Sequence, residues 1–154
     1  MGVVASVKGL CRVILPQSTH DIVFHNISAE FVPAQLHEDN TFSIIRALVS
    51  FIVGQKVDFN YPLDLPKATQ FQQAVWQATC SISYGETRSY SWVAQEAGYP
   101  GAYRATGRVL AHNPTPIVIP CHRVVARDGS LHGFQGGLEM KQRLILLEQN
   151  QQEG

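Results

Sequence analysis

The stretch that most constrains this 154-residue chain is Ile117-Val118-Ile119-Pro120-Cys121-His122-Arg123-Val124-Val125. Its β-branched residues predict a strand over residues 117–119, and Pro120, which has no backbone N–H to donate, predicts the strand's end. Cys121 would then lie at the mouth of that strand. A cysteine reacts as its thiolate, and cationic neighbours favour that form, so His122 and Arg123 mark Cys121 as a candidate nucleophile.

The other two cysteines, Cys11 and Cys80, lie in apolar runs, where a cysteine is most often a small buried side chain. Three widely spaced cysteines without a CxxC pair indicate neither a disulfide framework nor a zinc motif. Cys11, His20 and His25 have no spacing typical of a metal site. We therefore predict no metal, no cofactor and a reducing, intracellular environment.

The composition is that of a globular protein, with 45% hydrophobic and 16% charged residues. The formal net charge is zero, but its distribution is uneven. Residues 67–143 carry eight basic and four acidic side chains, whereas residues 1–66 carry four basic and six acidic ones. This asymmetry favours a polyanion partner for the second half. The sequence shows no secretory signal or membrane span, which predicts a cytoplasmic protein, or a nuclear one in a eukaryote.

The first half reads as a small sheet with one helix. Short β-branched runs predict strands over residues 9–15 and 21–27. Apolar residues spaced by three and four predict an amphipathic helix over residues 41–53, ending at Gly54. Residues 61–66 are extended and bounded by prolines, which is typical of a linker. We therefore predict an N-terminal domain with its linker over residues 1–66 and a C-terminal domain over residues 67–154.

The second half reads as mostly helical. Thr69 and Ser89 are candidate N-caps for two helices, the second over residues 90–97. Residues 102–112 predict a third helix, and the turn at residues 98–101 makes the last two a candidate helix-turn-helix. A glycine-rich loop at residues 129–137 and a helix over residues 138–149 close the chain. The predicted fold class is α/β (α+β), with a small N-terminal sheet-and-helix domain and a mostly helical C-terminal domain.

The run Asn113-Pro114-Thr115-Pro116, continued through Ile117 to Val125, resembles the active-site signature of the O6-alkylguanine-DNA alkyltransferases. The resemblance extends from about Phe71 to Glu148. It implies an RNase H-like N-terminal sheet, whose first strand looks truncated here. It also implies DNA repair by irreversible transfer of an alkyl group from O6-alkylguanine to Cys121, once per molecule, with O4-alkylthymine as an alternative substrate.

The resemblance assigns roles to three residues around Cys121. In the family the histidine matching His122 deprotonates the cysteine through a water, and the glutamate matching Glu148 orients the histidine. The asparagine matching Asn113 braces the active-site loop near the cysteine. Taken without the family, His122 would be a surface histidine, Glu148 a solvated helix end and Asn113 a helix C-cap.

The resemblance also implies that a monomer binds double-stranded DNA through the minor groove. The residue matching Tyr90 pushes against the target phosphate, and the one matching Arg104 fills the gap left by the rotated nucleotide. Ala102 and Gly107 are small enough for close approach to the groove. Additional phosphate contacts are expected from Arg88, Arg108, Arg123 and Arg127. Without the family, Tyr90 would be a packing residue and Arg104 a solvated cation.

The loop over residues 130–138 resembles the one that lines the family's guanine pocket. Phe134 stands where many members carry a tyrosine, so stacking is retained and the phenol hydroxyl is lost. Gln135, Gly136, Val124 and Tyr90 complete the predicted pocket. A departure from the family is Tyr103, which replaces a small residue just before Arg104.

Three other functions fit parts of the sequence. A relative that binds the lesion without efficient transfer would share the pocket, but the presence of Cys121 argues against it. A cysteine hydrolase would use the Cys121–His122 pair but also needs an oxyanion hole. A helix-turn-helix regulator would read the major groove and show sequence preference.

Overall fold

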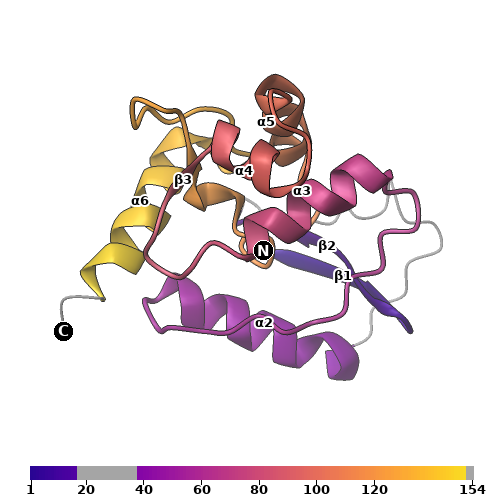
Figure 1. Cartoon of the computed structure of the whole chain (residues 1–154). Coiled ribbons are helices and arrows are strands. Elements are labelled where there is room, and N and C mark those ends of the chain that lie inside the picture. Colours follow the sequence, from indigo (N-terminus) through magenta and orange to yellow (C-terminus); the bar gives the residue numbers. More distant parts are fainter. Residues whose placement is uncertain (17–37, 152–154) are drawn as a thin grey trace. The chain divides into compact units, whose positions relative to one another are not determined.

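Figure 1 shows the computed structural model of the chain, which describes residues 1–16 and 38–151. The chain divides into two compact units, Met1–Leu65 and Pro66–Gly154. The described elements combine two two-stranded sheets with helices, which confirms the predicted mixed α/β class. The strand predicted over residues 21–27 lies outside the described residues.

The first unit is built on a hairpin. Strand β1 (Gly2–Ser6) pairs antiparallel with β2 (Gly9–Ile14), from Gly2 opposite Ile14 to Ser6 opposite Gly9. Strand β1 therefore spans β2 from end to end. Helix α2 (Glu38–Ile52) contacts β1 and begins three residues before the predicted start. Leu10, Val13, Leu48 and Phe51 are buried and form the core of this unit.

The predicted linker contacts the hairpin. The backbone N–H of Leu10 donates to the Pro62 carbonyl at 2.8 Å, and the N–H of Asp64 donates to the Leu10 carbonyl at 2.9 Å. A Cβ at Gly9 would collide with the Pro62 carbonyl, so this close approach requires glycine. The segment therefore extends the hairpin through a parallel bridge between Leu10 and Leu63.

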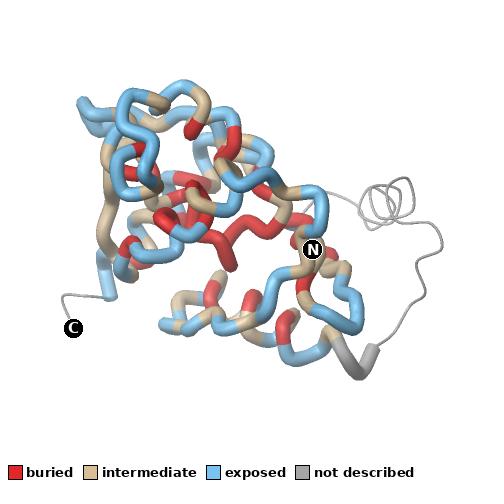
Figure 2. The backbone as a smooth tube through the Cα atoms, turned by 45° about the vertical axis from the view of Figure 1, so that its right-hand side comes forward, coloured by how far each residue is buried: buried red, intermediate tan, exposed pale blue. Residues whose placement is uncertain are grey.

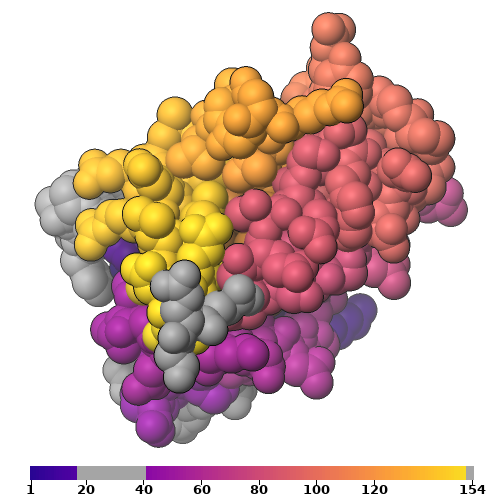
Figure 3. Space-filling model, turned by 60° about the vertical axis from the view of Figure 1, so that its left-hand side comes forward, coloured from indigo at the N-terminus to yellow at the C-terminus, as the bar shows by residue number. Residues whose placement is uncertain are grey.

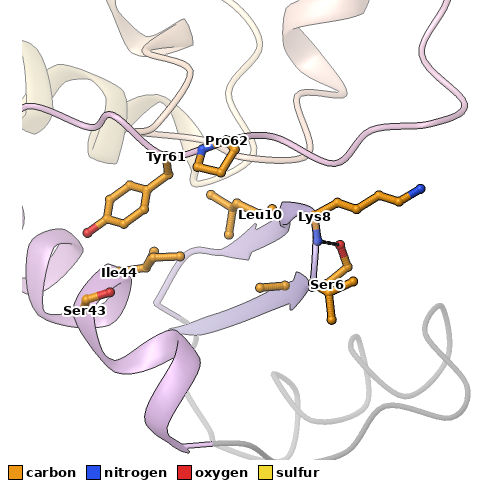
Figure 4. A pocket seen from close by; sticks show the side chains of 10 residues that line it. Ser6, Lys8, Leu10, Ser43, Ile44, Tyr61 and Pro62 are labelled. Atoms are coloured by element: carbon orange, nitrogen blue, oxygen red, sulfur yellow. Dashed lines mark hydrogen bonds between the residues drawn. The ribbon is translucent and has the colours of Figure 1, made fainter.

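A pocket of about 220 Å³ lies between the hairpin turn, α2 and this segment (Figure 4). Figure 4 shows Tyr61 and Pro62 on one side of it, Ile44 and Ser43 on α2, and Leu10 between them. Lys8 is the one charged residue in its lining. Because no cluster of reactive side chains lines this pocket, it has no evident chemical role.

Three helices form the body of the second unit: α3 (Gln70–Cys80), α4 (Tyr90–Glu96) and α5 (Tyr103–Ala111). Thr69 caps α3 in a reciprocal capping box with Gln72, and the Ser89 hydroxyl accepts from the Trp92 N–H at the start of α4, so both predicted N-caps are confirmed. Helices α4 and α5 contact each other and α3, and they are joined by the short turn predicted between them. Their inward faces are buried (Figure 2).

The strand predicted over residues 117–119 is wrong. Residues 117 and 118 form a turn, Ile117 has a positive φ of 76°, and the Ile119 N–H donates back to the Thr115 carbonyl at 2.9 Å. Residues Pro116 to Pro120 are all buried. The β-branched run therefore reflects burial in the core, which a turn can satisfy as well as a strand can.

Residues Cys121–Arg123 form a single turn of 3-10 helix, η1, and Val124–Val125 form β4. Strand β4 pairs in parallel with β3 (Arg88–Ser89), which directly precedes α4. This short ladder joins the segment after Cys121 to the start of the helix that carries Tyr90. The final helix, α6 (Gly137–Asn150), contacts η1 and buries Lys141, Leu144 and Glu148. Leu138, at the start of the same helix, is half exposed.

Candidate active site

Asn113 organises the loop that carries the cysteine. It is fully buried just after α5, where its Oδ1 accepts from the Thr115 N–H at 3.0 Å. Its Nδ2 donates to the Ile119 carbonyl at 2.9 Å and to Cys121 Sγ at 3.1 Å. One side chain therefore closes the loop and provides a hydrogen bond to the sulfur, where it stabilises the thiolate over the thiol.

Cys121 is buried, with 5% of its surface exposed. Burial raises the pKa of its thiol to about 11, although the hydrogen bond from Asn113 and the charge of Lys141 act in the opposite direction. The expectation that His122 and Arg123 favour the thiolate is wrong, because desolvation dominates and Arg123 is paired elsewhere. At neutral pH the residue rests as a thiol and needs a base in order to react.

The base candidate is His122, which is fully buried on η1 and contacts Glu148 across the site. Its Nε2 lies 2.7 Å from Glu148 Oε1, a second buried group. Burial lowers the pKa of His122 despite the nearby carboxylate, so the ring is neutral at pH 7. Hydrogen bonds from His122 and Arg123 outweigh burial at Glu148 and lower its pKa, which keeps it ionised. A neutral imidazole held by a carboxylate can accept a proton at Nδ1.

Arg123 binds the same carboxylate. Its Nε lies 2.9 Å from Glu148 Oε2 and its Nη2 lies 3.0 Å from Oε1, while Nη1 donates to the Ile82 carbonyl at 2.7 Å. Its guanidinium also stacks 5.6 Å from the centre of the Tyr84 ring. The sequence interpretation of Arg123 as a phosphate contact is wrong, because the guanidinium is turned into the protein and is only 12% exposed.

Sequence reasoning missed Lys141, which is fully buried on α6. Its Nζ donates to the His132 carbonyl at 2.8 Å and lies 3.4 Å from the Tyr90 hydroxyl. Burial lowers the pKa of Lys141 to about 8, with the Cys121 charge acting against it. A signal was available, because Lys141 shares the spacing of three and four with Leu144 and Glu148 that marks the inner face of the helix.

Tyr90, at the start of α4, faces this lysine. Its hydroxyl donates to the His132 carbonyl at 3.2 Å, and its ring lies 5.7 Å from Lys141 Nζ. Burial raises the pKa of Tyr90, and the charge of Cys121 raises it further, so the hydroxyl keeps its proton at neutral pH. Tyr90 and Lys141 therefore hold the glycine-rich loop by one backbone carbonyl, close to the sulfur.

Two of the predicted pocket residues, Phe134 and Gln135, lie beside the buried residues of this site. The ring of Phe134 lies 6.5 Å from the His122 ring in an edge-to-face arrangement, and Val124 is fully buried. The Gln135 side chain donates from Nε2 to the Asn113 carbonyl at 2.8 Å, which ties the loop to the asparagine. Gly136 is the N-cap residue of α6. The fold therefore brings Cys121, Asn113 and the glycine-rich loop together.

The predicted DNA-contact residues lie around the start of α4 and on α5. Arg104 and Arg108 are exposed, and the Arg104 guanidinium lies 5.7 Å from the centre of the half-exposed Tyr103 ring. Ala102 is the N-cap residue of α5. A Cβ at Gly107 would lie 3.8 Å from the Tyr90 ring, so this glycine backs the tyrosine. Arg88 forms an ion pair with Glu86 at 2.9 Å and stacks on Trp92.

Residues 1–16 and 38–151 contain no group of three or more histidine, cysteine or acidic side chains that could hold a metal ion. His20 and His25 lie outside those residues. None of the described helices is long and apolar enough to cross a membrane.

Comparison with known proteins decides the family. Residues 70–150 match the DNA-binding domain of 6-O-methylguanine DNA methyltransferase, which is more than half of the chain. The chain is 43% identical to a methylated-DNA–protein-cysteine methyltransferase of Methanosarcina barkeri, over 77% of its own length and 76% of the relative. It is 46% identical to the protein of that name from Mycolicibacterium paratuberculosis, over 68% of its own length and 62% of the relative.

The chain belongs to the methylated-DNA–protein-cysteine methyltransferase family. A solved structure of Mycobacterium tuberculosis OGT in complex with DNA superposes with a TM-score of 0.79 at 34% identity, covering 96% of this chain and 85% of that one. Members of this family are DNA-repair enzymes that transfer an alkyl group to one of their own cysteines, and this chain is one of these enzymes.

Proposed function

We propose that this methyltransferase removes alkyl groups from O6-alkylguanine in double-stranded DNA by transferring each group to Cys121, once per molecule. The observation that carries the proposal is the 3.1 Å contact between Asn113 Nδ2 and Cys121 Sγ, beside a buried His122–Glu148 pair. A nucleophile, a base and a residue that orients the base are the parts needed for attack by a neutral thiol.

The reaction replaces a carbon–oxygen bond with a carbon–sulfur bond. His122 Nδ1 takes the thiol proton, through a water as the family resemblance implies, and Sγ attacks the alkyl carbon from the side opposite guanine O6. The guanine leaves with the bonding electrons and takes up one proton, so that the products are guanine and an S-alkylcysteine. Because a thioether has no easy leaving group, the step is irreversible and the protein acts once.

Burial of the thiol fits this single-use chemistry. A pKa of about 11 keeps Cys121 protonated until a substrate is in place, which protects it from oxidants and metals that react with thiolates. The neutral state of His122 and the ionised state of Glu148 are those that a base requires before the transfer. The hydrogen bond from Asn113 then stabilises the developing thiolate.

Reaction on duplex DNA requires the damaged nucleotide to leave the helix stack, at a cost of a few kcal/mol. We assign this task to α4 and α5, which would bind as a monomer in the minor groove with little sequence preference. Arg104 would fill the gap and Tyr90 would turn the target phosphate, with Ala102 and Gly107 allowing close approach. Arg108 and Arg88 would contact other phosphates, the latter after release from Glu86.

The flipped guanine would be held by the glycine-rich loop. Phe134 lies beside His122 and offers an apolar face, and we assign the fully buried Val124 to the wall of the pocket. The backbone at Gln135 and Gly136 would meet the polar edge of the base. The Gln135 side-chain amide bonds the Asn113 carbonyl and so holds this part of the loop in place. This bond supports the proposal that the pocket is formed before DNA binds.

The decisive experiment is intact-mass spectrometry after incubation with excess duplex DNA that contains O6-methylguanine. We expect the wild-type protein to gain about 14 Da, saturating at one group per chain. Cys121→Ser should gain nothing. Cys80→Ser, which removes a thiol that is exposed and not buried as its apolar run predicted, should react like the wild type. Tight lesion binding without a mass gain would contradict the proposal and indicate a lesion-binding protein.

A further inference from the structure

Glu148 receives more donors than the support of one histidine requires. His122 Nε2 and Arg123 Nη2 both contact Oε1, while Arg123 Nε and the Gly85 N–H contact Oε2 at 2.9 Å each. Both carboxylate oxygens are therefore fixed in position. Figure 3 shows the yellow C-terminal helix, which carries Glu148, beside the rose-coloured segment near residue 85.

Arg123 connects this carboxylate to a second element. Its Nη1 donates to the Ile82 carbonyl at 2.7 Å, just after α3, and its guanidinium stacks on Tyr84 in the same turn. A planar guanidinium held at both ends presents its fork to Glu148 in one orientation, which a flexible lysine would not do. The arginine thus anchors the end of α6 to the turn after α3.

We propose that Arg123 is a positioning residue for alkyl transfer. It fixes the Glu148 carboxylate in the orientation that accepts a hydrogen bond from His122 Nε2, and it offsets part of the negative charge of that carboxylate. This inference rests on the proposed function of His122 as the base. Arg123 contacts neither the Cys121 thiol nor the guanine that leaves, so it acts on the reaction through Glu148 and His122. Nothing in the sequence distinguishes this role from a phosphate contact, because both need an arginine beside the cysteine.

The charges that face His122 give the direction of the effect. Glu148 and Lys141 face it from α6, and Arg123 and Cys121 are its neighbours on η1. Tyr84 faces Glu148 from the turn after α3, and Cys80 faces Arg123 from the end of α3. Glu148 favours protonated His122, whereas Arg123 and Lys141 disfavour it. Without Arg123 the carboxylate acts on the histidine with its full charge, and the pKa of His122 rises.

Only neutral His122 can accept the thiol proton, so the transfer rate falls when the pH drops through the pKa of the histidine. In the wild type this pKa is below its ordinary value of 6.5. In Arg123→Met we expect the acid limb of the rate profile to move to higher pH. The rate near pH 7 should be about ten- to hundredfold lower, with partial recovery at pH 9.

The test compares single-turnover transfer rates from pH 5 to pH 9 for wild type, Arg123→Met and Arg123→Lys. The lysine variant keeps the charge without the fork, so its acid limb should stay near that of the wild type while its rate falls by a smaller factor. Arg143→Met, which removes an exposed arginine from α6, is the matched control and should change neither. A loss in Arg123→Met that is equal at every pH would overturn the proposal.

A second measurement separates this inference from the proposed function. NMR titration of the His122 ring in 15N-histidine-labelled protein reports its protonation without any DNA or reaction. We expect the midpoint to rise in Arg123→Met and to change little in Arg123→Lys. An unchanged midpoint in Arg123→Met overturns the positioning role even if alkyl transfer is established. A raised midpoint in a protein that takes up no alkyl group would leave the role of Arg123 standing and contradict the proposed function alone.

Discussion

The surroundings of Cys121 and the start of α5 differ in the burial of their polar side chains and in the hydrogen bonds that these side chains make within the protein. The buried side chains are Asn113, His122 and Glu148. Asn113 is already bonded to the Ile119 carbonyl, and His122 to Glu148, before any substrate binds. Arg104, by contrast, is exposed, and its guanidinium lies over the ring of Tyr103, which is itself half exposed.

This difference matches the two tasks that we assign to the regions. Groups that stabilise charge during a reaction act best when they are already oriented and shielded from water. Groups that bind a nucleic acid must stay accessible and can gain their partners on binding. The comparison therefore predicts that substitutions around Cys121 affect every substrate, whereas substitutions at the start of α5 affect only duplex DNA.

The largest effect should come from Asn113→Ala. The change removes the hydrogen bond to Cys121 Sγ and the one that holds the Ile119 carbonyl. We expect transfer to slow by about a hundredfold, by the same factor for duplex DNA and for free O6-benzylguanine. Single-turnover rates with both substrates provide the measurement. A loss confined to duplex DNA would break the comparison, because it would make Asn113 a DNA-binding residue.

The next effect in size is that of Arg104→Ala. Without the arginine, nothing fills the gap in the stack to offset the free energy of rotating the nucleotide out. Repair of duplex DNA should therefore slow by about tenfold or more. Reaction with free O6-benzylguanine should stay within about twofold of the wild type, since no stack has to be opened. Arg143→Ala, which removes an exposed arginine from α6, is the matched control. Equal losses with both substrates would exclude the assigned role of Arg104.

A smaller and pH-dependent effect is expected for Lys141→Met. The charged lysine lowers the pKa of Cys121, and the pKa of Lys141 itself is about 8. The wild type should therefore react faster than the variant at pH 7, by about tenfold, and this ratio should shrink as the pH rises through 8 and the lysine loses its charge. Rates measured from pH 7 to pH 9.5 test this. A ratio that is constant with pH would mean that Lys141 acts only by holding the His132 carbonyl.

The smallest effect should be that of Thr69→Ala, which lies in neither region. Loss of the capping box at α3 should lower the free energy of unfolding by about 1 kcal/mol, as measured by urea denaturation. Transfer rates with both substrates should be unchanged, so the variant gives the effect of lost stability alone. Gln77→Ala, at an exposed position of the same helix outside the capping box, should change the unfolding free energy by less. A slower reaction in Thr69→Ala would show that stability limits the rates in the other variants.

Local signals in the sequence located most of the second unit correctly. The N-caps Thr69 and Ser89, the three helices and the turn between α4 and α5 all follow from residue types within a few positions of each other. In the first unit, a β-branched run predicted β2 and helical spacing predicted α2, but no local signal predicted the pairing partner β1. These predictions hold because helix caps and amphipathic faces depend on residues that are close together in the sequence.

The sequence by itself determined that Cys121 stands beside a histidine at a break in an apolar run, and that Asn113 and Glu148 lie where the family resemblance needs them. Only the tertiary structure decided that the apolar run is a turn, that Cys121 is a buried thiol, that Arg123 binds Glu148 and that Lys141 is buried beside Tyr90. The physical reason is that desolvation and ion pairing depend on groups from distant segments, here from η1, α6 and the turn after α3, and no local pattern encodes their meeting.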